Sequence, residues 1–347
     1  MSNYSKNISR QLNSKLNEIL ADLPDFVRMF FVGIDATTAI KTRIAYATDL
    51  RTFFTYLIDE SILPNTKSVD AITLKQIDDL DSMFIERYLA YLSQYKKPND
   101  DTVYTNSNSA KARKLSSIRS MYRYFYKKGA IKNNPSLLVD MPKKKEKPIV
   151  RLEVEESADL LDSIESGEHL SKTQKRYHNK TSVRDLAIIT LMLGTGIRIS
   201  ECVGLDIADI NFSDSSFRVT RKGGNDEILY FGEEVKEALE DYLKLRNKII
   251  ALPGEESALF LSLQKKRMQV SSVQKMLKKY IDGAVPLKNI SPHKLRSTFG
   301  TNLYRETGDI YLVADVLGHK DVNTTRKHYA AGSEELRKAA AKNIKLR

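Results

Sequence analysis

Two arginines of this chain stand beside residues that would equip them to hold a phosphate. Arg198, in the segment GTGIRISECVGL, precedes Glu201 by three residues. On a helix this spacing puts both side chains on one face, where the carboxylate can orient the guanidinium. Arg296, in SPHKLRSTFGTNL, follows His293 by three residues, after a Ser-Pro pair typical of a helix start. Backbone N–H groups at such a start also attract an anion. Taken alone, the Arg198–Glu201 pair is better interpreted as an ordinary surface ion pair, and His and Arg at this spacing often occur by chance.

Three further residues could supply a third cation, a proton carrier and a nucleophile. Lys222 lies in VTRKGGNDEILYF, at a glycine-rich turn between two strand-like segments, from which an ammonium could reach a phosphate. His319 follows a glycine in LGHKDVNTTRKHYAAG, and Tyr329 stands ten residues later. Taken singly, a turn lysine is usually solvated. A tyrosine usually packs in the core, and because the chain has 17 tyrosines, Tyr329 alone carries little weight.

Together these residues form a set suited to phosphoryl transfer. Arginines and a lysine would neutralise the equatorial oxygens of a phosphodiester, a tyrosine would attack it, and histidines would bind the phosphate or move protons. Arginines can neutralise this charge without the magnesium that other enzymes use. One cysteine, five histidines and no convincing acidic cluster leave little for a disulfide or a metal centre. We therefore expect no metal and no other cofactor.

Length and charge indicate the size of the protein and the kind of partner. The 347 residues are enough for two domains. Lys and Arg number 56 against 44 Asp and Glu, a net charge of +12, which favours nucleic acid as a partner, ahead of an anionic membrane. No apolar run approaches the roughly 18 residues of a membrane span, and the N-terminus lacks a signal-peptide pattern. We expect an intracellular, cytoplasmic protein without a membrane partner.

The first part of the chain reads as helical, with one strongly basic helix. Apolar residues recur three or four positions apart, and a helix is predicted near 107–128. Between Lys111 and Gly129 this segment contains no acid. A solvated helix face is one interpretation, but the absence of a balancing acid favours contact with phosphates. The candidate DNA contacts are Lys111, Arg113, Lys114, Arg119 and Arg123.

The second part mixes helix and strand after a basic linker. The segment MPKKKEKPIVR, residues 141–151, places a lysine cluster between prolines and is too polar for a core. We predict a loop for the polar, basic residues 171–184, then an apolar helix through DLAIITLMLGTG. FRVT and EILYF alternate like the strands of a hairpin. The expected fold is mainly α with a small β-sheet.

The order of the reactive residues resembles the tyrosine recombinase family, also called the phage integrase family. The family's order of Arg, Lys, His-x-x-Arg, His and Tyr is matched by Arg198, Lys222, His293, Arg296, His319 and Tyr329. The flanks GTGIRISE, PHKLRSTFGT and LGH match as well, and the TRKGG turn resembles single-recombinase Xer proteins. The resemblance covers residues 152–347 and extends more loosely to the first part. It implies an N-terminal extension at 1–24, a helical core-binding, DNA-binding domain at 25–140, the linker at 141–151, and a mixed α/β catalytic domain at 152–347.

The resemblance also implies a mechanism. Tyr329 would attack the scissile DNA phosphate and form a 3′-phosphotyrosyl bond, while Arg198 and Arg296 hold the non-bridging oxygens. Glu201 would support the Arg198 side, and His319 would hydrogen-bond the phosphate.

Two more roles concern protons. Lys222 would protonate the departing 5′-oxygen, and His293 is the candidate to accept the tyrosine proton. The covalent intermediate preserves the phosphoester, so neither ATP nor metal is required.

The implied partner is duplex DNA carrying a short inverted-repeat recombination site. The two domains would form a clamp on this DNA, and a homo-tetramer would join two sites at the nucleoid. Residues 333–347 could form a last helix that docks on a neighbouring protomer or packs on its own chain. We expect no separate arm-binding domain before the helical domain.

Alternatives remain open at this point. A type IB topoisomerase uses a similar set of residues, and a DNA-binding regulator could keep the fold without catalysis. A metal-dependent nuclease fits less well. Within recombinases, the role is either chromosome dimer resolution or the integration and excision of a mobile element.

Overall fold

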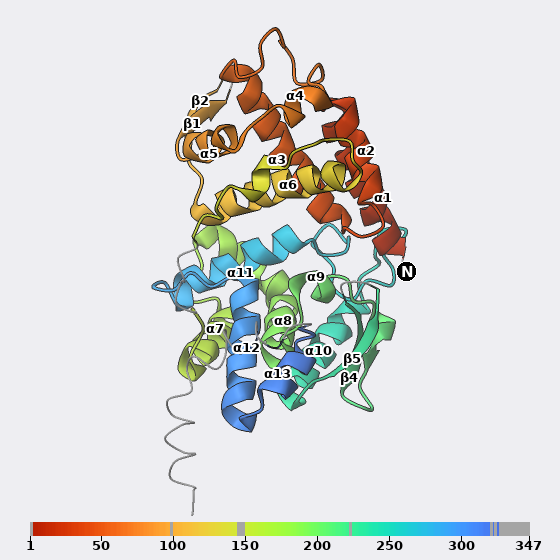
Figure 1. Cartoon of the computed structure of the whole chain (residues 1–347). Helices are drawn as coiled ribbons and strands as arrows, with labels where there is room; N and C mark the ends of the chain where they lie inside the picture. Colours follow the sequence, from red (N-terminus) through yellow and green to blue (C-terminus); the bar gives the residue numbers. More distant parts are fainter. Residues whose placement is uncertain are drawn as a thin grey trace, which may run out of the picture. The chain divides into compact units, whose positions relative to one another are not determined.

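The computed structural model describes residues 3–97, 100–143, 150–221, 224–319, 322 and 325. The chain divides into two compact units, Met1–Lys147 and Pro148–Arg347. Helices predominate in both units (Figure 1). Among the described residues, the first unit holds a two-stranded sheet and the second a three-stranded one. The predicted fold, mainly α with a small β-sheet, is thus confirmed. No helix in the described ranges is long and apolar enough to cross a membrane.

The first unit is a helical bundle with one β-hairpin. Its helices bury a single apolar core that is rich in aromatic rings, including Phe30, Phe53 and Tyr88. The predicted basic helix begins after Ser107, whose side chain accepts a hydrogen bond from the backbone N–H of Ala110 and caps the helix. The elements are α1 (Asn3–Ala21), α2 (Asp25–Gly33), α3 (Ile40–Asp59), α4 (Leu74–Asp78), α5 (Ser82–Tyr91), β1 (Tyr95–Lys97), β2 (Asp100–Tyr104), α6 (Asn108–Lys127) and the 3₁₀ turn η1 (Pro135–Leu137).

The acid that balances part of the basic helix α6 comes from α3. Asp49 is fully buried and pairs with both Arg113 and Lys114, the latter at 3.1 Å between Nζ and Oδ1. Lys114 is itself buried. Arg119 donates hydrogen bonds to the carbonyl oxygens of Ser136, at 3.0 Å, and Val139. The assignment of Lys114 as a DNA contact is therefore corrected to an internal ion pair. Arg119 is half-buried, holds the backbone at and after η1 through these hydrogen bonds, and stays a candidate for contact with DNA phosphates.

The three remaining candidates on α6 have side chains that reach the surface. Lys111 is half-buried and donates to Ser93 Oγ at 2.6 Å. Arg113 keeps about half of its side chain exposed despite its contact with Asp49, and Arg123 is exposed. These three stay candidates for contact with DNA phosphates.

Replacing Asp49 with alanine should lower the free energy of unfolding by about 3–5 kcal/mol, because Lys114 would lose its carboxylate in a buried position. Chemical denaturation of the full chain measures this change. Asp25→Ala is the matched control, since Asp25 is exposed and lies 3.9 Å from Arg28, so its loss should cost less than about 1 kcal/mol. Equal losses for the two variants would contradict the structural role of Asp49.

The second unit is built around the long helix α8, which packs against four other helices. Its residues Ala187–Met192 are all buried. The antiparallel sheet has the order β3-β4-β5, and its strands β4 and β5 confirm the hairpin predicted from FRVT and EILYF. The elements are α7 (Val154–Ser166), α8 (Lys172–Thr195), α9 (Ile199–Cys202), the 3₁₀ turn η2 (Ile207–Asp209), β3 (Ile210–Asn211), β4 (Ser216–Thr220), β5 (Asp226–Tyr230), α10 (Glu233–Arg246), α11 (Val270–Ala284), α12 (Pro292–Thr307) and α13 (Ile310–Val316).

The predicted loop at 171–184 is wrong, because these residues form the first half of α8. Ser171 caps the helix in a reciprocal pair with Gln174, whose side chain accepts from the Ser171 N–H at 2.9 Å. The buried positions of this half are His178 and Thr181, both polar. The apolar periodicity that would reveal a helix is therefore missing from the sequence.

Candidate active site

The turn between α8 and α9 positions Arg198. Gly196 ends α8 with a φ of 63°, a left-handed conformation that favours glycine. A Cβ atom at this position would lie 2.4 Å from Cδ1 of Phe299 and 2.9 Å from Cδ2 of Leu317. Only a residue without a side chain lets α12 and the end of α13 approach the turn this closely. Because Arg296 lies on α12, this close approach brings Arg296 near Arg198.

Replacing Gly196 with alanine should lower the free energy of unfolding by more than the roughly 1–2 kcal/mol of left-handed strain alone. The added methyl group would also force Phe299 and Leu317 apart, so the cleavage rate should fall too. Gly254→Ala is the matched control, since Gly254 has a φ of 85° and an added methyl group there would meet no atom within 4 Å. Similar unfolding costs for both variants, measured by thermal denaturation, would show that the close approach contributes nothing.

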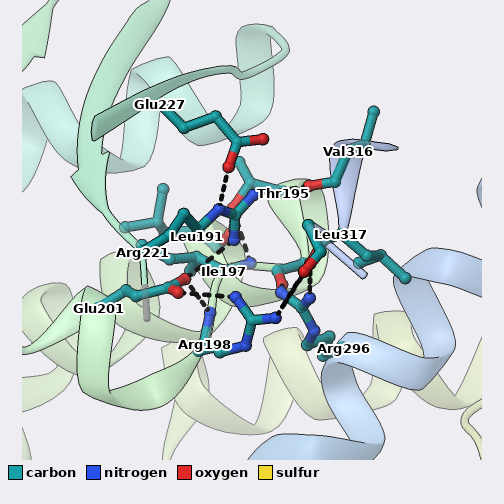
Figure 2. Close-up of polar contacts among 12 residues, drawn as sticks. Leu191, Thr195, Ile197, Arg198, Glu201, Arg221, Glu227, Arg296, Val316 and Leu317 are labelled. Carbon is teal, nitrogen blue, oxygen red and sulfur yellow. Dashed lines mark hydrogen bonds and ion pairs between the residues drawn. The ribbon is translucent and has the colours of Figure 1, made fainter. Parts of the chain in front are cut away.

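Glu201 links two guanidinium groups. Its Oε1 accepts from Nη1 of Arg198 at 2.8 Å, and its Oε2 accepts from Nη1 of Arg221 at 3.1 Å (Figure 2). The backbone N–H of Arg198 also donates to Oε2, at 3.0 Å. The carboxylate is nearly buried, so these charge-assisted bonds are shielded from water. The Arg198–Glu201 contact is the one that the three-residue spacing predicts.

Arg198 and Arg296 converge on the backbone that follows α13. Nη2 of Arg198 donates to the carbonyl oxygens of Leu317, at 3.3 Å, and Gly318, at 3.1 Å. Arg296 is buried on α12 and donates to the carbonyl oxygens of Gly196 and Leu317 (Figure 2). The structure therefore brings together two arginines that lie about a hundred residues apart in the sequence. Their positive charges meet at the turn that leads into His319.

The two histidines occupy different environments. His293 lies one turn before Arg296 on α12 and is exposed. His319 is half-buried, and its Nδ1 lies 2.8 Å from Oγ1 of Thr325. Its backbone N–H donates to the carbonyl of Ala314, which ties the histidine to α13. An exposed imidazole suits proton exchange, and a tethered one suits a fixed hydrogen bond to a ligand.

Several proposed site residues lie outside the described residues. These are Lys222, Tyr329 and the segment 333–347. Cys202, directly after Glu201, is fully buried, and burial raises the pKa of its thiol to about 12. It therefore stays a thiol at neutral pH and offers no nucleophile. Among the described residues, no group of His, Cys, Asp or Glu is arranged to hold a metal ion.

Sequence reasoning missed Arg221 and its partner Glu227. Arg221 is buried at the end of β4 and donates to Glu227 on β5, besides its contact with Glu201. Its Nη2 donates to the carbonyl oxygen of Val316 at 2.8 Å. The sequence carried only a weak signal for this residue, its place directly before Lys222 in the TRKGG turn.

Comparison with known families matches both parts of the chain. The model of the phage integrase family matches residues 151–335, and the phage integrase SAM-like domain matches residues 22–144. The chain belongs to the phage integrase family. Within it, the chain is a site-specific tyrosine recombinase of the Xer-like type, an enzyme that cleaves and rejoins DNA.

Curated relatives are similar over most of their length. Tyrosine recombinase XerC of Caldanaerobacter subterraneus subsp. tengcongensis is 33% identical over 308 residues, which cover 86% of this chain and 80% of the relative. Tyrosine recombinase XerS of Streptococcus uberis is 31% identical over 356 residues, which cover 95% of this chain and 98% of the relative. The XerS likeness spans nearly the whole of both chains.

Solved structures share the fold. XerH site-specific recombinase bound to a palindromic difH substrate superposes with a TM-score of 0.64 at 18% identity, over 87% of this chain and 79% of that one. The Tn1549 transposon integrase in complex with transposon right end DNA also gives 0.64, at 19% identity, over 91% and 98% of the two chains. At this identity the likeness concerns the fold alone.

Proposed function

We propose that this enzyme exchanges DNA strands at a short inverted-repeat site through a 3′-phosphotyrosyl intermediate. The observation that supports this most is the convergence of Arg198 and Arg296 at the turn before His319. A cluster of guanidinium groups beside a histidine suits the charge of a phosphodiester in its transition state.

The arginines would bind the scissile phosphate. Each guanidinium has five N–H groups in a fixed fork, so Arg198 can contact a non-bridging oxygen while Nη1 stays on Glu201. Arg296, held from two sides by backbone carbonyls, is oriented before DNA arrives. His319 would donate a further hydrogen bond to the same phosphate.

The chemical steps would conserve the phosphoester bond. The oxygen of Tyr329 attacks phosphorus, the bond to the 5′-oxygen breaks, and a 3′-phosphotyrosyl bond forms. The tyrosine proton passes to His293, and Lys222 gives a proton to the departing 5′-oxygen. A 5′-hydroxyl from the partner strand then attacks the phosphotyrosine, which frees Tyr329 and rejoins the DNA.

Binding would involve both units and two DNA sites. DNA is the substrate, and Lys111, Arg113, Arg119 and Arg123 on α6 are the proposed phosphate contacts of the first unit. We propose a homo-tetramer on two sites, acting at the nucleoid in chromosome dimer resolution or mobile-element transfer. Phosphate contacts release counterions, so DNA affinity should fall steeply with rising salt concentration.

Removing residues 333–347 should impair tetramer assembly more than binding to a single site. The apolar line Leu336, Ala340 and Ile344 would dock on a neighbouring protomer, which single-site binding does not require. Sedimentation of protein–DNA complexes, with a titration of a half-site duplex as control, separates the two effects. A truncated protein that still assembles the full tetramer would show that the segment does not dock in trans.

A suicide substrate tests the proposed function. Duplexes taken from DNA that flanks the gene, nicked beside the candidate cleavage position, are incubated with the protein in EDTA and then denatured in SDS. A covalent protein–DNA adduct is expected. Tight, salt-sensitive binding without an adduct at any candidate site would contradict the strand-cleavage proposal, and an adduct that requires added magnesium would contradict the metal-independent mechanism.

A further inference from the structure

Arg221 joins three elements of the second unit through one side chain. Its Nε donates to Glu227 on β5, its Nη1 to Glu201 on α9, and its Nη2 to the carbonyl of Val316 at the end of α13 (Figure 2). The residue is only 8% exposed. A buried guanidinium with donors on three elements holds these elements in one arrangement.

The backbone passes closely over this guanidinium. Gly318 has a φ of 57°, and a Cβ atom there would lie 3.1 Å from Nε and 3.2 Å from Cζ of Arg221. The glycine thus lets the turn before His319 lie against Arg221. The same guanidinium therefore touches the turn that carries His319 and the carboxylate that orients Arg198.

We propose that Arg221 is a positioning residue for strand cleavage, which acts through Glu201 on Arg198. The inference rests on the proposed phosphate-binding role of Arg198. Each guanidinium contacts a different oxygen of Glu201: that of Arg198 donates to Oε1, and that of Arg221 donates to Oε2. Because Arg221 takes up part of the negative charge, Glu201 orients Arg198 without fully neutralising it.

The charges around the site fit this role. The five side chains Arg198, Arg221, Arg296, Glu201 and Glu227 carry one net positive charge, to which the proposed Lys222 would add another. Without Arg221 the remaining four side chains would be neutral. Glu201 would then face Arg198 alone and compete with the phosphate for its guanidinium.

The test compares Arg221→Gln and Arg221→Lys with a matched control. Arg218→Gln changes an arginine three residues earlier, on β4, which is exposed and pairs with Asp209 at 3.1 Å. For each protein, DNA affinity, thermal unfolding and the rate of adduct formation on the suicide substrate are measured. Arg221→Gln should slow adduct formation by about 10²-fold. Its DNA affinity should stay near the wild-type value, Arg221→Lys should recover part of the rate, and Arg218→Gln should match the wild type.

Two modified substrates identify the route by which Arg221 acts. A methylphosphonate at the scissile position removes the negative charge that Arg198 would neutralise, so the rate difference between the wild type and Arg221→Gln should shrink to a few-fold. A sulfur in place of the 5′-oxygen leaves without a proton, so it relieves the need for Lys222 and should leave the Arg221→Gln defect unchanged.

Other results would overturn the inference. These are wild-type rates for Arg221→Gln, an equal defect on the phosphate and methylphosphonate substrates, or recovery on the sulfur substrate. If Arg221→Gln does not fold, the same comparison is made with Arg221→Lys, and a defect that the methylphosphonate leaves unchanged then counts against the inference. A wild-type protein that forms no adduct would contradict the proposed function and this inference together. A wild type that cleaves normally, beside an equally active Arg221→Gln, would contradict the inference alone.

Discussion

Tyr329→Phe should reduce the rate of covalent adduct formation by at least about 10⁴-fold, because no other group can replace a missing nucleophile. DNA binding should be nearly unchanged, since the ring remains and only the hydroxyl is lost. The measurement is the adduct band on the suicide substrate, together with a DNA titration of the same protein.

Tyr311→Phe is the control for this experiment. Tyr311 lies on α13 and is 71% exposed, so the loss of its hydroxyl should leave cleavage and stability unchanged. An adduct that forms at the wild-type rate in Tyr329→Phe would assign the nucleophile to another residue. Loss of the adduct in both variants would point to a general loss of structure.

Lys222→Ala should slow cleavage by about 10²–10⁴-fold, which is the usual contribution of a general acid. The 5′-oxygen leaves poorly as an alkoxide, whereas a 5′-sulfur leaves readily as a thiolate. On the 5′-thiol substrate, the variant should therefore regain most of the wild-type rate. Adduct formation on the two substrates measures both effects.

The matched control for Lys222 is a surface lysine of the same unit. Lys244 on α10 pairs with Asp241 at 2.8 Å and is well exposed, so Lys244→Ala should cleave both substrates at wild-type rates. An equal defect of Lys222→Ala on the oxygen and sulfur substrates would rule out a role in protonating the leaving group. Such a defect would instead fit a role in binding the phosphate.

Local signals in the sequence predicted much of the fold. Ser107 begins α6, the Ser-Pro pair at 291–292 begins α12, and Gly196 ends α8 in the left-handed conformation. Capping and turn chemistry involve residues within four positions of one another, so they can be read without a structure. The same holds for Arg198 and Glu201, whose contact spans a single helical turn.

Apolar periodicity failed to predict a helix where the buried residues are polar. The first half of α8 buries His178 and Thr181, so its pattern reads as a polar loop. On the basic helix α6, the sequence did not reveal the partner of a charged residue. The helix appeared unbalanced because its acid, Asp49, lies 64 residues before Arg113 in the chain.

The sequence by itself predicted the order of the proposed reactive residues, through the family resemblance. It also predicted the contact between Arg198 and Glu201, because this contact joins close neighbours along the chain. Tertiary structure alone decided which charges share a partner. Glu201 meets Arg221 across 20 residues, and Arg198 meets the carbonyl of Gly318 across 120. Such pairings follow from the packing of α9, the β4–β5 hairpin and α13 against one another. No local spacing encodes them, and for this reason Arg221 emerged only from the folded chain.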